Sequence, residues 1–89
     1  MHKIKAYVLE PNCIEIIVDD NTYLLSYNTV VLCRDHGPNG TGKTFLDPVW
    51  DCTKSTTKHT CRFLNMKPKE VRGWINDGKL HIADLDKGR

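Results

Sequence analysis

The chain has 89 residues, of which 39% are hydrophobic and 27% are charged. This composition excludes a disordered chain, and no apolar run approaches the length of about 20 residues that a membrane-spanning helix needs. The length suits one small hydrophobic core, so we expect residues 1–89 to form a single domain.

The net charge of +2 conceals an uneven distribution along the chain. Residues 1–52 contain four basic and seven acidic side chains, whereas residues 53–89 contain nine basic and four acidic ones. A basic segment of this kind suits nucleic acid or an acidic protein surface, although a solvated face that binds nothing has the same composition. The residues predicted to form a contact surface are Lys54, Lys58, Arg62, Lys69, Arg72, Asn76 and Lys79.

The first half of the chain has the pattern of an antiparallel β-meander. Short apolar or alternating segments are separated by Pro11-Asn12 and by Asp19-Asp20-Asn21, which are typical turn residues, and Ser26-Tyr27-Asn28-Thr29 leads into the fourth segment. The predicted strands are residues 3–9, 13–18, 22–25, 30–33 and 44–46.

Residues 37–44 match the phosphate-binding pattern G-x-x-x-x-G-K-[ST]. A phosphate-binding loop also needs a helix that begins at the Gly-Lys pair, because its N–H groups and dipole hold the phosphates. Pro48 falls beyond the first turn of that helix, where a proline costs about 3 kcal/mol. We therefore interpret this segment as a glycine-rich hairpin loop, with an anion-binding loop that does not hydrolyse nucleotides as an alternative.

The second half changes to helical periodicity. Thr53 or Ser55 is a plausible N-cap for a helix that ends near Asn65, and Pro68 suits the first position of a second helix. Val71, Trp74 and Ile75 are expected to form the buried stripe of the second helix, which Gly78 ends as a C-cap glycine. A last strand is expected at residues 80–85, so the fold class is α+β, with a helix-turn-helix pair before a C-terminal strand.

The segment 62–80 resembles excisionase-type and MerR-type DNA-binding segments, in which two helices precede a wing. That resemblance implies that Arg72 and Asn76 read base edges while Lys54, Lys58 and Lys79 contact phosphates. One arginine and one asparagine are few base-reading residues. An ordinary helical hairpin packed on a sheet has the same sequence pattern.

Metal and catalytic sites have weaker support in the sequence. Cys33-x-x-His36 and His59-x-Cys61 have ligand types that suit Zn²⁺, but neither is a C-x-x-C pair, so we predict no metal. Without a secretory signal, free thiols are the expected state of the four cysteines. No nucleophile has a recognisable catalytic context, so the chain is not expected to be an enzyme.

Two further segments are Ser26-Tyr27-Asn28-Thr29-Val30-Val31 and Trp50-x-x-x-x-Ser55-Thr56-Thr57-Lys58-His59-x-x-x-Phe63-Leu64. Together they resemble a family of short proteins of unknown function encoded mainly by tailed bacteriophages and prophages. The resemblance implies that Tyr27, Trp50, Thr57 and His59 meet and tie the helix start to the sheet as a structural polar cluster. It supplies no catalytic residues.

We therefore expect a non-enzymatic phage accessory binding module that acts in the host cytoplasm on a host protein or defence system. It is expected to need no cofactor. A nucleic-acid-binding helix-turn-helix protein and a small anion- or nucleotide-binding protein that uses the 37–44 loop are the alternatives. A homodimer is a further alternative, because an exposed edge strand such as the N-terminal one can pair with a second copy.

Overall fold

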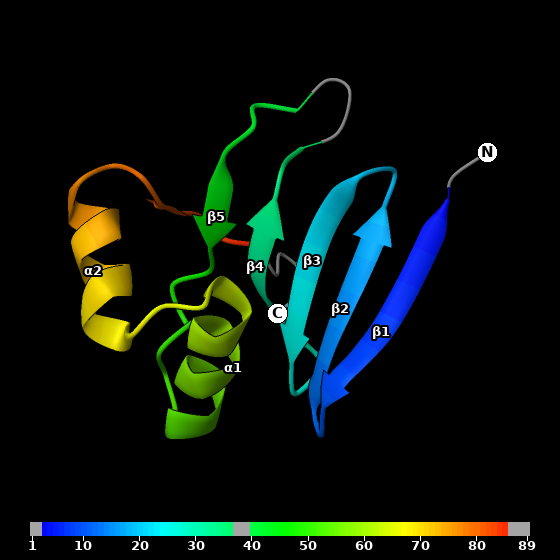
Figure 1. The fold of residues 1–89 in the computed structure, drawn as a ribbon, viewed down its shortest axis with the longest axis horizontal. Helices are drawn as coiled ribbons and strands as arrows, with labels where there is room; N and C mark the ends of the chain where they lie inside the picture. Colours follow the sequence, from blue (N-terminus) through cyan, green and yellow to red (C-terminus); the bar gives the residue numbers. More distant parts are fainter. Residues whose placement is uncertain (1–2, 37–39, 86–89) are drawn as a thin grey trace.

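The computed structural model describes residues 3–36 and 40–85. One six-stranded sheet has the strand order β1-β2-β3-β4-β5-β6, which follows the chain (Figure 1). All neighbouring strands are antiparallel except β5 and β6, which are parallel. The elements are β1 (Ile4–Glu10), β2 (Cys13–Val18), β3 (Asn21–Ser26), β4 (Thr29–Arg34), β5 (Thr44–Leu46), α1 (Lys54–Leu64), α2 (Pro68–Asn76) and β6 (His81–Ile82).

Tight turns join the first four strands. Asp19 and Asp20 both have positive φ angles, as do Tyr27 and Asn28, and two consecutive residues of this kind make the hairpin turn whose twist matches that of paired strands. Aspartate and asparagine tolerate this conformation well, whereas an aromatic residue such as Tyr27 adopts it rarely. The Tyr27 φ of 51° therefore needs support from outside the turn.

Both helices have the ends that their sequences predict. The Thr53 side chain caps α1 by accepting a hydrogen bond from the Thr56 N–H at 3.1 Å. Asn65 ends α1 in the left-handed region, with a φ of 57°. Pro68 is the first residue of α2, and the Glu70 carboxylate accepts the Lys67 N–H at 3.1 Å.

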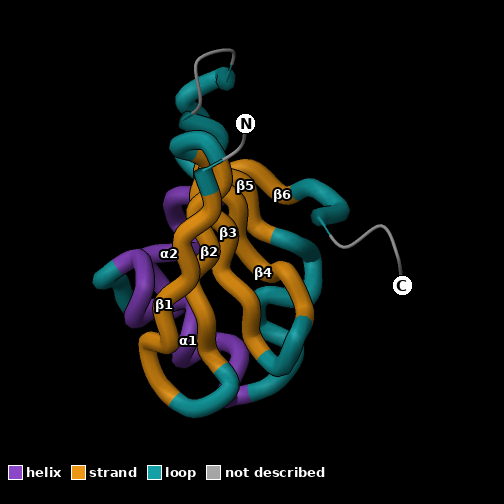
Figure 2. The backbone as a smooth tube through the Cα atoms, turned by 90° about the vertical axis from the view of Figure 1, so that its right-hand side faces the viewer, coloured by secondary structure: helices purple, strands orange, loops and turns teal. Residues whose placement is uncertain are grey.

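The core lies between one face of the sheet and the two helices. Figure 2 shows both helices on the same side of the strands. Leu24, Leu32 and Leu46 come from three adjacent strands and are fully buried, and Val71 of α2 is also fully buried. Alternation along the strands then places the intervening residues on the opposite face of the sheet.

The element order and the α+β class agree with the prediction, and two details do not. The last strand contains only His81 and Ile82, because after Ala83 the Leu85 N–H turns to the Asp47 carboxylate at 2.9 Å. Trp74 is 43% exposed, because α2 contacts the core through Val71. The Trp74 ring instead lies under the Lys79 amine. No helix among the described residues is long and apolar enough to cross a membrane.

Candidate functional site

The predicted basic contact surface is exposed at all of its positions. Lys54, Lys58 and Arg62 follow one another at four-residue intervals and form a row along α1. Lys69, Arg72 and Asn76 are exposed on α2, and Lys79 follows that helix. The helices therefore present positive charge on two separate elements.

Several of these residues already have partners within the chain. Arg62 forms an ion pair with Glu10 at 3.1 Å. The predicted base-reading residue Arg72 lies 3.5 Å from the Asp51 carboxylate, with its guanidinium 5.5 Å from the centre of the Trp50 ring. Lys54 and Lys58, by contrast, take part in no ion pair with the described residues. Among the described residues, α1 thus has two lysines without an ion pair, whereas α2, the helix expected to read bases, has one, Lys69.

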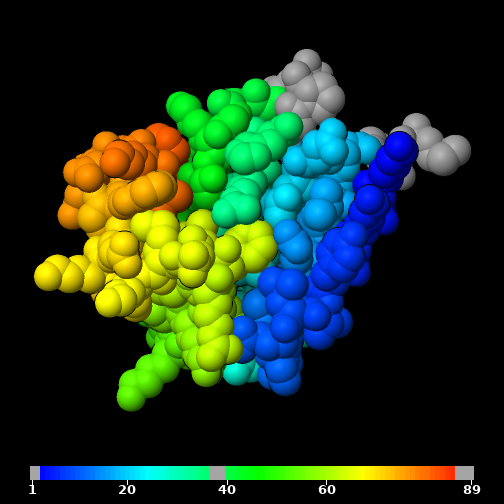
Figure 3. All heavy atoms as spheres, viewed as in Figure 1, coloured from blue at the N-terminus to red at the C-terminus, as the bar shows by residue number. Residues whose placement is uncertain are grey.

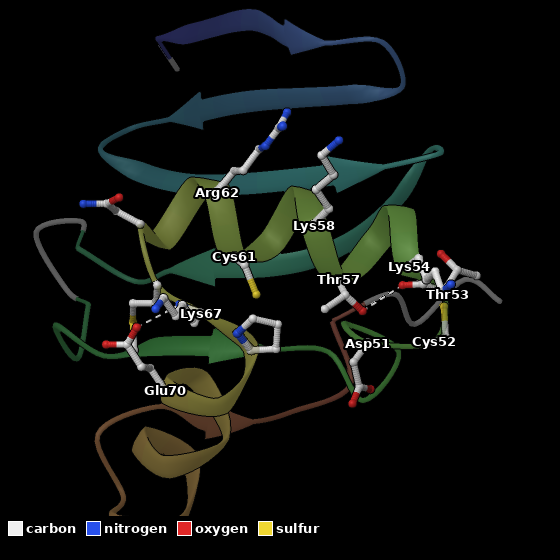
Figure 4. A pocket seen from close by; sticks show the side chains of 13 residues that line it. Asp51, Cys52, Thr53, Lys54, Thr57, Lys58, Cys61, Arg62, Lys67 and Glu70 are labelled. Atoms are coloured by element: carbon white, nitrogen blue, oxygen red, sulfur yellow. Dashed lines mark hydrogen bonds between the residues drawn. The ribbon is translucent and has the colours of Figure 1, made fainter.

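A hollow of about 820 Å³ lies between α1, the start of α2 and the segment before α1. In Figure 4 the Cys61 and Thr57 side chains project into this hollow, whereas Lys58 and Arg62 project from α1 away from it. Asp51 and Glu70 also line it and bring negative charge. Because its walls have both signs of charge, the hollow lacks the concentration of cations that would select a phosphate.

A buried polar network joins the sheet to α1. The Ser26 hydroxyl donates to the Thr56 hydroxyl at 3.1 Å and lies 2.8 Å from Nδ1 of His59. The Tyr27 ring stacks on the His59 ring, with 5.7 Å between centroids. This stacking is the outside support for the rare backbone conformation of Tyr27.

The predicted polar cluster is therefore present only in part. Tyr27 and His59 meet, but the Thr57 hydroxyl donates to the Thr53 carbonyl at 2.7 Å, and the Trp50 ring faces Arg72. Ser26 and Thr56 take the inner positions instead. Ser26 and Thr56 belong to the segments 26–31 and 50–64 that resemble the phage family. Thr56, and not Thr57, joins the network because it lies three residues before His59 and on the same face of α1.

The network contains the residue types of a hydrolase triad. His59 Nε2 lies 3.7 Å from the Glu10 carboxylate, so a serine, a histidine and a carboxylate stand in line. The Ser26 side chain, however, is only 2% exposed and its oxygen is shared between two partners. A substrate has no direct approach to this hydroxyl in this conformation, and a structural network fits the burial better than a nucleophile.

The combination of Cys33, His36, His59 and Cys61 that the sequence suggested for zinc does not form. Within the described residues, the potential ligands that gather are Glu10, Cys13 and His59, whose ligand atoms all lie within 4.8 Å of one another. All four cysteines are free thiols, as predicted. Burial, and secondarily the Glu10 carboxylate, raises the pKa of the Cys13 thiol.

The face of the sheet that points away from the helices is apolar. Register places the pairs Ile4–Val18, Ala6–Ile16 and Val8–Ile14 there, since Cys13 and Ser26 point to the helices. We define the open face by the residues Ile4, Ala6, Val8, Ile14, Ile16, Val18, Tyr23, Leu25, Val30, Cys33 and Phe45. No described helix covers this face (Figure 2).

Strand β1 is both the edge of the sheet and its most exposed element. Ile4 is 67% exposed and Val8 is 76% exposed, and Tyr7 and Leu9 are also exposed. The Asp19 N–H donates to the Lys3 carbonyl, so the backbone groups of Lys3 point toward β2 and those of the alternate residues Ile4, Ala6 and Val8 point outward. Figure 3 shows β1 along one end of the molecule, opposite the helices.

The described part of the glycine-rich loop forms hydrogen bonds with the carboxylate of Asp35, which precedes the loop. The Thr41 N–H and hydroxyl both donate to the Asp35 carboxylate, at 3.0 and 3.2 Å, and the Gly42 N–H donates to the Asp35 carbonyl. Residues 37–39 of the predicted anion-binding loop lie outside the described residues. Thr44 begins β5 and not a helix, as the hairpin interpretation predicts.

Comparison with known proteins found no matching family model, no matching curated protein and no matching solved structure. The function must therefore be inferred from the geometry of these surfaces.

Proposed function

We propose that the chain is a non-enzymatic protein-binding module, and that the open face and the β1 edge are its contact surface. The observation that carries the proposal is the row of apolar side chains on the face of the sheet that no described helix covers. An antiparallel sheet with one face in water normally presents polar side chains there, because each layer of a domain buries its apolar face against another layer. The open face lacks that second layer within the described residues.

The energetic reason for a partner lies mainly in β1. Full burial of a valine or isoleucine side chain stabilises by about 1.5–3 kcal/mol, and Ile4 and Val8 have most of their surface left to bury. Large exposed apolar patches of this kind mark interaction sites in soluble proteins. The outward backbone groups of β1 add a second means of recognition, since an extended partner segment can pair with them as a further strand.

This surface differs from the one that composition favours. The basic row on α1 remains available for a nucleic acid, and the two unpaired residues Lys54 and Lys58 are the observation in favour of this second candidate. Against it, Arg72 is engaged with Asp51 and Trp50. We therefore rank a protein partner first and a nucleic acid second.

The proposed biological setting follows from the resemblance to small phage proteins. In that setting the partner is a host protein, the compartment is the host cytoplasm and the module modulates a host machine or defence system. The free thiols agree with a reducing compartment. The open face also suits a second copy of this chain, so the test must separate the two kinds of partner.

The experiment compares three proteins in a pull-down from bacterial lysate with and without nuclease. Wild type is compared with Val8→Lys, which puts a charge on the open face, and with Lys58→Glu, which reverses a charge on α1. Both sites are exposed, so both variants should keep the fold. Circular dichroism checks that they do. We expect one host protein to be recovered by wild type and Lys58→Glu, but not by Val8→Lys, regardless of nuclease.

Two other results would contradict this proposal. Recovery that depends on nucleic acid and is lost in Lys58→Glu would favour the nucleic-acid reading. A wild-type dimer in light scattering that becomes monomeric in Val8→Lys, without any captured protein, would assign the open face to self-association.

A further inference from the structure

Glu10, Cys13 and His59 bring three different metal-binding groups together from three elements. Glu10 ends β1, Cys13 begins β2 as its register partner, and His59 lies in the middle of α1. A register shift between Val8 and Glu10 changes the direction in which the Glu10 side chain points. Cys13 is 1% exposed and His59 is 5% exposed, so two of the three groups are held within the protein.

The hydrogen bonds of His59 leave one ring nitrogen directed at this group. Nδ1 of His59 lies 2.8 Å from the Ser26 oxygen and forms a hydrogen bond with it. The other ring nitrogen, Nε2, faces the Glu10 carboxylate at 3.7 Å from Oε1, and it can bind an ion when it carries no proton. A second group that fixes the far nitrogen of a histidine is the usual support of a metal-ligating histidine.

We propose that Glu10, Cys13 and His59 form a binding site for a divalent transition-metal ion of the Zn²⁺ class, with water as the fourth ligand. Bond lengths of roughly 2.0–2.3 Å in a tetrahedral site put ligand atoms about 3.3–3.7 Å apart. The separation of 3.7 Å between His59 and Glu10 agrees with this, and all three atoms lie within 4.8 Å. Rotation of the side chains that moves their ligand atoms by about 1 Å brings all three to the spacing of a tetrahedral site.

The charges around the site set the conditions for binding. The Cys13 thiol must lose its proton to the solvent when the ion binds, because the thiolate is the form that ligates a metal. The Arg62 guanidinium, 3.1 Å from Glu10, opposes a cation, but its side chain is 59% exposed and can move into water. The carboxylate and the thiolate then neutralise the ion, and His59 contributes no charge.

A bound ion would fasten the end of the β1–β2 hairpin to α1. Because the ion binds the folded state, it would stabilise that state and position the base of the edge strand relative to the helices. This inference is independent of the proposed protein partner and can fail or hold separately from it.

The test titrates Co²⁺, with its visible spectrum, into chelator-treated protein without a histidine tag, and then displaces it with Zn²⁺. We expect one ion per chain and a thiolate-to-metal charge-transfer band. Cys13→Ser should remove the band and weaken binding roughly tenfold or more, whereas the control Cys61→Ser, also at a buried cysteine but outside the group, should keep both.

Glu10→Gln provides a second measurement if Cys13→Ser does not fold, because the Glu10 side chain is 24% exposed and the change keeps its shape. It should weaken binding roughly tenfold while leaving the thiolate band in place at saturation. Absence of the band in wild type, a band that persists in Cys13→Ser, or unchanged affinity in Glu10→Gln would each overturn the proposal.

Discussion

Removal of the Ser26 hydroxyl tests whether the buried network holds the sheet to α1. Ser26→Ala leaves Nδ1 of His59 and the Thr56 hydroxyl without their partner, and both residues are only 5% exposed. A buried polar group left without a hydrogen bond costs about 1–3 kcal/mol. Two such groups give an expected loss of about 2–6 kcal/mol, a large share of the roughly 4–13 kcal/mol expected for a domain of this length.

Thr60→Val is the matched control for this change. Thr60 is fully buried in α1, but its hydroxyl finds no hydrogen-bond partner among the described residues. Replacing it with a methyl group should leave stability unchanged or raise it by about 1 kcal/mol. Two buried hydroxyls on the same interface should thus give results of different sign.

The assay is urea unfolding followed by circular dichroism in the presence of a chelator, so that no metal contributes. A Ser26→Ala variant within about 0.5 kcal/mol of wild type would refute the role of the network. A loss in Thr60→Val as large as that in Ser26→Ala would show that any buried hydroxyl on α1 matters, and not this network.

Two further predictions concern pH and a helix end. Burial is the largest cause of the raised pKa values of the Cys13, Cys33 and Cys61 thiols, so folding favours their protonated forms. The free energy of unfolding should therefore fall as pH rises through and above the ordinary thiol pKa of 9.0. Constant stability between about one pH unit below and about one pH unit above that value would contradict this prediction. Gly78→Ala should cost about 1–2 kcal/mol, because the φ of Gly78 is 77°, which a residue with a side chain adopts at a cost. Crowding adds nothing to this cost, since no atom of the described residues lies within 4 Å of the added methyl group. Gly73→Ala, in helical conformation and equally uncrowded, should instead gain up to about 1 kcal/mol in the same unfolding assay, and equal effects at the two glycines would refute the backbone argument.

Local features of the sequence predicted most of the elements. Turn residues with positive φ separate the strands, and Thr53, Pro68 and Gly78 mark the helix ends, because caps and turns depend on only a few neighbouring residues. Pro48 indicated that no phosphate-binding helix follows the glycine-rich loop, and Thr44 begins strand β5. In each case the physical cause lies within a few residues of its effect.

The candidate sites depended on contacts that a local pattern does not contain. Glu10 and Cys13 lie more than 40 positions before His59, and their meeting depends on the strand register and on where α1 crosses the sheet. The choice of Thr56 over Thr57 depends on which face of α1 meets Ser26. Trp74 was misplaced for the same reason, since helical periodicity gives the spacing of a stripe but not its width.

The sequence by itself predicted the α+β order of elements, the free-thiol state of the four cysteines and the basic character of α1. Only the tertiary structure decided that the other described residues form no covering layer over the apolar residues of β1 and β2, because the same alternating pattern serves a strand with one buried face or with two. It also decided which of the polar residues meet at His59. Side-chain meetings between distant segments are set by packing, and that packing is a property of the whole chain.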